Sequence, residues 1–269
     1  MGSQRRINLT APGEPFDSPL ILSPSKDERF AQDVPVESRA SGSSFDKLRT
    51  SESQRAVKRT IEVRRLGLIP YADALALQRS LVEDRRAGRV GDLLLFAEHP
   101  HVLTLGVRGD GGRSHILATG DALARRGVEV HEAGRGGDIT YHGPGQIVGY
   151  PIVDLKPDRC DVHRYVRDLE DVLIRTVADY GIDASRVEGL TGVWIGREKL
   201  AAIGVRISRW ITSHGFALNV STNLDYFNLI IPCGIPDRGV TSLERLLGRT
   251  IDGGDVQDRL ASHFNSVFS

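Results

Sequence analysis

The residue with the clearest potential for chemistry is a cysteine in a tight turn. Cys233 lies between Pro232 and Gly234 in the short apolar stretch 230–235. The flanking proline and glycine favour a turn that presents the thiol, which suits a nucleophile. A nucleophilic thiol also needs a nearby cation or base that keeps it as the thiolate. A buried, inert cysteine is the ordinary alternative, and these residues alone leave it open.

A second candidate is a lysine at the start of an apolar strand. Gly196-Arg197 is typical of a hairpin turn, and Lys199 follows it directly before the apolar run 200–203. Most lysines are solvated charges, but one at the mouth of a buried strand can have a depressed pKa or pair with an anion. The other cysteine, Cys160, has no comparable setting and is assigned no role.

The third feature is the glycine-rich segment 135–146, RGGDITYHGPGQ, in which five of twelve residues are Gly or Pro. Glycines let the backbone approach a ligand closely and turn N–H groups toward it. Arg135, Thr140, Tyr141 and His142 add donors. The segment matches neither a Walker A loop nor GxGxxG, so a nucleotide site lacks its usual support. A β-turn with satisfied polar residues is the alternative.

Composition limits the class of protein. The chain has 269 residues, 40% of them hydrophobic, which is enough for a large single core. Lys plus Arg equals Asp plus Glu at 35 each, so no net field draws in nucleic acid or an anionic membrane. Two cysteines make no disulfide framework and indicate a reducing compartment. There is no apolar run of membrane-spanning length and no secretory signal, so we expect a cytoplasmic protein.

Two regions differ in character. Residues 1–59 are rich in Ser, Pro and charged side chains without apolar periodicity, and we expect a disordered extension. Too early a start site would also explain the segment, whereas its many acids argue against a transit peptide. Residues 60–269 are expected to form one globular catalytic domain, and no internal repeat is visible.

The elements predicted in the second region mix strands and helices, and the strands cluster in the second half. This order favours an α/β fold of the α+β type, with a mixed, largely antiparallel sheet flanked by helices, over a doubly wound parallel sheet. A helical turn is also expected at 223–227. The predicted strands are 61–66, 92–96, 102–105, 128–130, 146–155, 191–195, 200–207 and 211–220, and the predicted helices are 71–87, 121–126, 162–180, 241–247 and 255–268.

Five segments in this order resemble the octanoyltransferases of lipoate biosynthesis, the octanoyl-[acyl-carrier-protein]:protein N-octanoyltransferases. The resemblance extends from Ile61 to the C-terminus. Each pattern is weak alone, but five in order are specific. The departures are small: His101 stands where a second proline is common, and Leu200 where isoleucine is common. The segments are 98–100 with 104–106, 135–146, 199–206, 214–220 and 231–235.

The resemblance implies a ping-pong mechanism. Cys233 would accept the octanoyl group from octanoyl-acyl carrier protein as a thioester, and an acceptor lysine would then attack it. Lys199 would stabilise the thiolate and later accept the proton of the incoming amine. Because the donor thioester is already activated, no ATP, metal or other cofactor is implied. The implied acceptors are the lipoyl domains of 2-oxoacid dehydrogenase complexes and the glycine cleavage H protein, and we expect a monomer.

The resemblance also implies the fold of the biotin and lipoate ligase catalytic domains and an acyl site with backbone N–H groups as an oxyanion hole. An apolar slot beneath would set the chain-length preference. The residues implied in binding are Arg135, Gly136, Gly137, Asp138, Ile139, Thr140, Tyr141, His142, Ala202, Ile203, Gly204, Gly215, Phe216 and Ala217.

Three other functions compete. An ATP-dependent lipoate–protein ligase would share the fold and the acceptor, but it needs no cysteine like Cys233. A non-catalytic module that binds acyl carrier or lipoyl domains would leave Lys199 far from Cys233. A cysteine hydrolase would need an oriented histidine, for which His142 and His214 are candidates, but their order fits no hydrolase motif.

Overall fold

A computed structural model describes residues 59–234 and 238–269, and of Cys233 it describes only the backbone. Nearly all of the predicted extension therefore lies outside the described residues. At Arg59 the chain already contacts the domain, because its guanidinium donates to the carbonyl oxygens of Asp154 at 2.8 Å and Lys156 at 2.6 Å.

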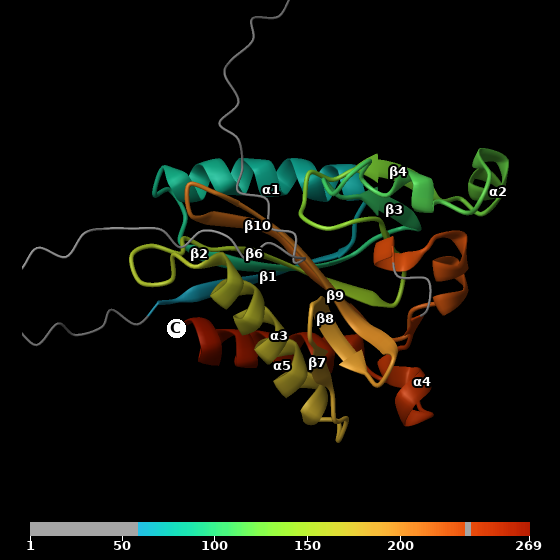
Figure 1. Cartoon of the computed structure of the whole chain (residues 1–269). Coiled ribbons are helices and arrows are strands. Elements are labelled where there is room, and N and C mark those ends of the chain that lie inside the picture. The colour runs from blue at the N-terminus through green and yellow to red at the C-terminus, as the bar shows by residue number, and fades with distance from the viewer. Residues whose placement is uncertain (1–58, 235–237) are drawn as a thin grey trace, which may run out of the picture.

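The centre of the molecule is an eight-stranded mixed sheet (Figure 1). Its strand order is β1-β2-β6-β10-β9-β8-β7, and β11 pairs with β9. Only the β1–β2 and β9–β11 pairs are parallel among these described strands. The strands are β1 (Ile61–Leu68), β2 (Asp92–Glu98), β6 (Gln146–Ile152), β7 (Ser185–Val187), β8 (Leu190–Ile195), β9 (Glu198–Ser208), β10 (Ile211–Asn219) and β11 (Gly239–Val240).

Helices cover both faces of this sheet, as Figure 1 shows. The helix α1 (Tyr71–Arg86) packs on one face, against an apolar cluster that includes residues of β2, β6 and β10. The helices α3 (Val162–Ala178) and α5 (Gly253–Phe268) pack together on the other face, where the largest apolar cluster lies. The short helix α4 (Leu243–Leu247) precedes α5. Both faces of the sheet are thus buried, which explains the continuous apolar runs in its central strands.

A second, three-stranded sheet of order β4-β3-β5 lies at one end of the domain. It carries the glycine-rich segment, because residues 133–139 connect β4 with β5. Its apolar side packs against the short helix η2 and the helix α2. The elements are β3 (Val102–Leu105), η1 (Arg113–His115), α2 (Gly120–Arg125), β4 (Glu129–Glu132), β5 (Thr140–His142), η2 (Leu224–Leu229) and η3 (Pro232–Gly234).

The predicted fold class is confirmed, and every predicted helix and strand is present with its ends shifted by a few residues. The strands β5, β7 and β11 were not predicted, because runs of two or three residues beside glycines carry no measurable periodicity. None of the helices in the described part of the chain is long and apolar enough to cross a membrane.

Candidate active site

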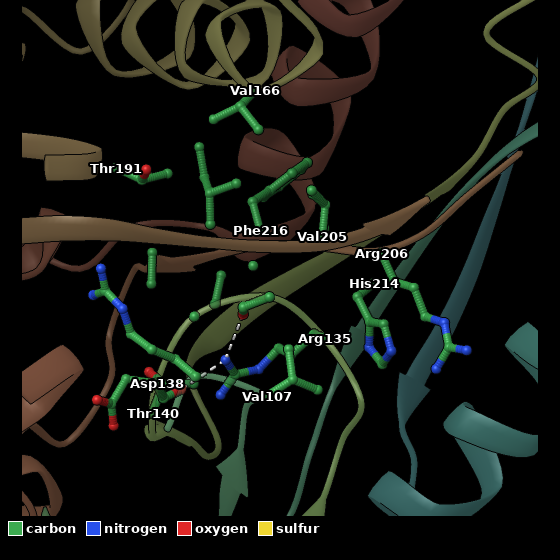
Figure 2. Close-up of a pocket in the computed structure, with 18 of the residues that line it drawn as sticks. Val107, Arg135, Asp138, Thr140, Val166, Thr191, Val205, Arg206, His214 and Phe216 are labelled. Carbon is green, nitrogen blue, oxygen red and sulfur yellow. Dashed lines mark hydrogen bonds between the residues drawn. The ribbon is translucent and has the colours of Figure 1, made fainter. Parts of the chain in front are cut away.

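A cavity of about 470 Å³ lies beside the central strands β9 and β10, within the usual size range of small-molecule sites. Figure 2 shows that it reaches both sides of these strands: Val166 and Thr191 lie on one side, and Arg135 and Thr140 on the other. The glycine-rich loop, β9, β10 and α3 all contribute to its lining. The cavity therefore lies where the small sheet meets the large one.

Arg135 holds the glycine-rich loop in shape. Its Nη1 donates to the carbonyl oxygens of Gly136 at 3.1 Å and Asp138 at 2.7 Å, as the dashed lines in Figure 2 show. Its Nη2 donates to the carbonyl oxygen and the hydroxyl of Thr104 at 2.7 and 2.8 Å. The guanidinium is buried and used within the protein, so Arg135 shapes the site through the loop backbone.

The loop lies directly against β9. The N–H group of Gly136 donates to the carbonyl oxygen of Val205 at 2.9 Å. A Cβ added at Gly204 would lie only 3.0 Å from the Gly136 carbonyl oxygen, and one added at Gly106 would lie 2.0 Å from that of Gly137. The glycines at these positions thus permit a backbone approach that a side chain would prevent.

An irregularity in β9 sets the direction of Lys199. Lys199 pairs with Trp194 of β8, whereas Ala201 pairs with Val193, so one extra residue, Leu200, is inserted between the two pairs. Lys199 and Ala201 are two residues apart and would normally share a face of the strand. Their partners Trp194 and Val193 are adjacent in β8 and point to opposite faces, so Lys199 and Ala201 do so too. Ala201 and Val193 join the core under α3, and Lys199 lies on the other side and lines the cavity.

The backbone of the cysteine turn reaches the same cavity. The turn η3 is held by the N–H group of Ile231, which donates to the carbonyl oxygen of His115 at 2.8 Å. Gly234 lines the cavity, and a Cβ added there would lie 2.8 Å from His115 Cε1 and 3.2 Å from Asp138 Oδ2. His115 is fixed in turn by Asp138, with Nδ1 and Oδ1 2.9 Å apart.

The chain that follows the turn reaches Lys199. Val240 of β11 pairs with Lys199 in the parallel ladder, and the N–H group of Thr241 donates to the Lys199 carbonyl oxygen at 3.0 Å. Lys199 and Gly234, the neighbour of Cys233, therefore line one cavity although they are far apart in the sequence.

A buried chain of hydrogen bonds connects Arg135 with the backbone of Lys199. Thr104 Oγ1 lies 3.3 Å from His142 Nε2, and His142 Nδ1 donates to Gln146 Oε1 at 2.7 Å. The Gln146 amide donates to Asn219 Oδ1 at 2.9 Å, and Asn219 donates to the Thr241 carbonyl oxygen at 2.9 Å. Each group donates to the next in the same direction, which favours mutual polarisation of the bonds.

The two buried histidines of the site are neutral near pH 7. Burial lowers the pKa of His142 to about 3, and the nearby His99 and the Arg135 guanidinium act in the same direction. Burial likewise lowers the pKa of His214 to about 3, with the charges of Arg135 and Arg206 adding to the effect. Neither histidine can hold a proton in the neutral range, so neither suits general acid–base chemistry there.

Most of the predicted site residues come together. Among the predicted residues whose side chains the structure describes, Ile139 and Tyr141 do not line the cavity: alternate residues along 139–142 face opposite sides, and these two are buried under the small sheet. No cluster of His, Cys, Asp or Glu that could hold a metal exists among the described residues. The predicted residues that line the cavity are Arg135, Gly136, Gly137, Asp138, Thr140, His142, Lys199, Ala202, Ile203, Gly204, Gly215, Phe216 and Ala217.

Two neighbours of the site were not predicted from the sequence. His115 was missed because its contact with the cysteine turn joins segments more than a hundred residues apart. Trp194, whose ring lies 4.6 Å from Lys199 Nζ, was treated as an ordinary strand residue. A large aromatic residue just before the predicted hairpin turn was the one available signal.

The mixed sheet with helices on both faces is the fold of the lipoate-protein ligases. Lipoate-protein ligase A bound with ATP superposes with a TM-score of 0.62 at 17% identity, over 77% of this chain and 85% of that one. A bipartite lipoate protein ligase from Thermoplasma acidophilum gives 0.61 at 16% identity, over 78% and 84%. Residues 70–265 match the lipoyl protein ligase A/B catalytic domain, and the chain belongs to this family.

Relatives at higher identity define the activity more narrowly. An octanoyltransferase from Myxococcus xanthus is 53% identical over 215 residues, which cover 78% of this chain and 60% of that protein. One from Solibacter usitatus is 52% identical over 206 residues, which cover 77% and 92%. The chain is an acyltransferase that transfers octanoyl groups in protein lipoylation.

Proposed function

We propose that the chain moves an octanoyl group in two steps through Cys233. In the first step the Cys233 thiolate attacks the thioester carbon of octanoyl-acyl carrier protein, and the carrier thiolate leaves. In the second step the ε-amine of an acceptor lysine attacks the Cys233 thioester, an amide forms, and the Cys233 thiolate leaves. The observation that carries this proposal is the shared cavity of Lys199 and the Pro232–Gly234 turn.

Lys199 serves both steps in this mechanism. As an ammonium group it stabilises the Cys233 thiolate and so raises the fraction of reactive nucleophile. It gives its proton to the carrier thiolate that leaves in the first step, and in the resulting neutral form it accepts the proton that the acceptor amine loses on forming the amide. Its burial, with 8% of its surface exposed, strengthens its interaction with a neighbouring charge relative to water.

The acyl chain is expected to lie against β9 and β10. Ala202, Gly204 and Ala217 line the cavity with little or no side chain, which leaves room along the strands. Each methylene buried there contributes about 0.8 kcal/mol, which gives a preference for chain length. The N–H groups of Gly137 and Asp138 are the loop's candidates for an oxyanion hole, because that of Gly136 donates to the Val205 carbonyl oxygen.

The donor and acceptors follow from this chemistry. We propose octanoyl-acyl carrier protein as donor, and the lipoyl domains of 2-oxoacid dehydrogenase complexes and the glycine cleavage H protein as acceptors. A thiol nucleophile suits a reducing compartment, which supports action in the cytoplasm. We further propose that the protein acts as a monomer. The neutral His142 and His214 argue against the hydrolase alternative, since neither can act as a base that becomes protonated near pH 7.

The test is intact-protein mass spectrometry after mixing the enzyme with octanoyl-acyl carrier protein in the absence of acceptor. We expect one octanoyl adduct that hydroxylamine removes, that is absent in Cys233→Ala and that persists in Cys160→Ala. No adduct, together with acceptor modification that requires ATP and free acid, would instead assign the chain to the ligases.

A further inference from the structure

A tryptophan lies between the lysine of the site and an arginine that follows the cysteine turn. The Nζ atom of Lys199 is 4.6 Å from the centroid of the Trp194 ring, and the Cζ atom of Arg238 is 5.2 Å from it. Both separations are within the range of cation–π attraction, which is strongest for tryptophan. Trp194 is 1% exposed and Lys199 is 8% exposed, so water screens this contact little.

Trp194 is itself held firmly from its own strand. Its neighbour Val193 packs in the core under α3. The N–H group of Gly192 donates at 3.0 Å to Oε1 of the buried Glu170, which Arg167 and Arg186 neutralise. The Trp194 ring therefore has little freedom to move. It provides a fixed surface against which the long Lys199 side chain can be held.

The unpaired indole nitrogen of Trp194 also supports a role for the ring as a surface that holds cations. This buried N–H group has no hydrogen-bond acceptor among the described residues, although a buried indole usually finds one. The site tolerates the cost of an unpaired donor, which a phenylalanine would avoid. The strong negative potential of the indole face accounts for a tryptophan here, because it attracts both cations.

Arg238 brings a second segment of the chain to this ring. It lies five residues after Cys233 and directly before β11, whose two residues pair with Glu198 and Lys199. Its guanidinium lies on Trp194, so the residue that leads into β11 is docked on the ring that also contacts Lys199. One side chain thus contacts both Lys199 and the residue next to the strand that pairs with Lys199.

We propose that Trp194 is a positioning residue: its indole face holds the Lys199 ammonium at the cavity, and Arg238, docked on the same ring, holds the start of β11, which pairs with Lys199. This inference rests on the proposed roles of Lys199 and Cys233. It assigns Trp194 no contact with substrate. Its effect is on the position of the Lys199 ammonium, and through it on the reactivity of the Cys233 thiol.

The test compares Trp194→Leu with Trp194→Tyr in a Cys160→Ala background, so that Cys233 is the one remaining thiol. The rate of alkylation by iodoacetamide is measured from pH 6 to 9. We expect Trp194→Leu to slow alkylation roughly 5- to 30-fold near pH 7, with the profile moved to higher pH, since the cation–π contact is lost. Trp194→Tyr keeps an aromatic face and should recover much of the rate. A Trp194→Leu profile that coincides with the parent overturns the proposal, and so does a Tyr variant as slow as the Leu variant.

A second pair of variants keeps the proposal testable if Trp194→Leu fails to fold. Arg238→Gln should slow alkylation roughly 2- to 5-fold at pH 7. The matched control is Arg245→Gln, because Arg245 is a nearby surface cation that pairs with Glu198 at 3.5 Å. Equal rates in both variants and the parent argue against the role of Arg238. Alkylation needs no acyl donor. If no octanoyl adduct formed, the proposed function would be contradicted, but the alkylation rates would still test the role of Trp194.

Discussion

At the scale of single residues, Lys199 has an unusual setting for a lysine, because only 8% of its surface is exposed. Its ammonium loses hydration there and needs other groups around it. The ring of Trp194 provides one such group, and in the proposed mechanism the Cys233 thiolate provides another. The charge of Lys199 and the reactivity of Cys233 are then linked.

Replacing Lys199 should therefore change the reactivity of the Cys233 thiol. In a Cys160→Ala background, Lys199→Ala is expected to raise the pKa of Cys233 and to slow its alkylation about tenfold at pH 7, because a free cysteine has a pKa of about 8.5. The two rates should converge at high pH, where the thiol is ionised in both proteins. Equal rates from pH 6 to 9 would remove the ion pair from the mechanism.

Lys199→Arg separates the two roles of the lysine. Arginine keeps the positive charge, so alkylation near pH 7 should recover at least in part. It cannot give up its proton, so transfer of the octanoyl group to the acceptor lysine should stay slow. Recovery of full acceptor transfer would show that the lysine does not act as a base.

At the scale of elements, the sequence predicted β9 and the turn before it but not the face that Lys199 occupies. The apolar run in 200–207 is enough to predict a strand. The extra residue at Leu200 becomes visible only through the register with β8, which depends on contacts between strands. For the same reason the sequence could not separate Ile139 and Tyr141 from Thr140 and His142, since their opposite faces follow from the placement of β5.

The close contact between β9 and the glycine-rich loop predicts the effect of one methyl group. A Cβ at Gly204 would lie 3.0 Å from the Gly136 carbonyl oxygen and would narrow the cavity. We expect Gly204→Ala to lower kcat/KM for octanoyl donors more than for hexanoyl donors, with the ratio falling roughly fourfold, the equivalent of one buried methylene. Gly91→Ala is the control, because its Cβ would meet nothing within 4 Å. An unchanged ratio would place the acyl chain elsewhere.

At the scale of the whole molecule, formal charge is balanced, but the site contains histidines that fold in the neutral form. Such groups connect stability to pH. The folded pKa of His214 is lowered to about 3, whereas an unfolded histidine titrates near 6.5. Below about pH 6.5, His214 binds a proton in the unfolded chain but not in the folded chain. The free energy of unfolding therefore decreases as the pH falls from about 6.5 toward 3.

His214→Asn isolates this contribution. His214 has a φ of 54°, a left-handed conformation that asparagine tolerates better than most residues, so the substitution removes the titrating group with little backbone strain. Urea unfolding between pH 4 and 6 should show a slope of unfolding free energy against pH that is smaller than that of the parent by about one proton, or about 1.4 kcal/mol per pH unit. His163→Asn, at an exposed position of α3, should leave the slope unchanged. Parallel slopes for His214→Asn and the parent would mean that His214 takes up its proton in the folded protein, and the hydrolase alternative would then regain a candidate base.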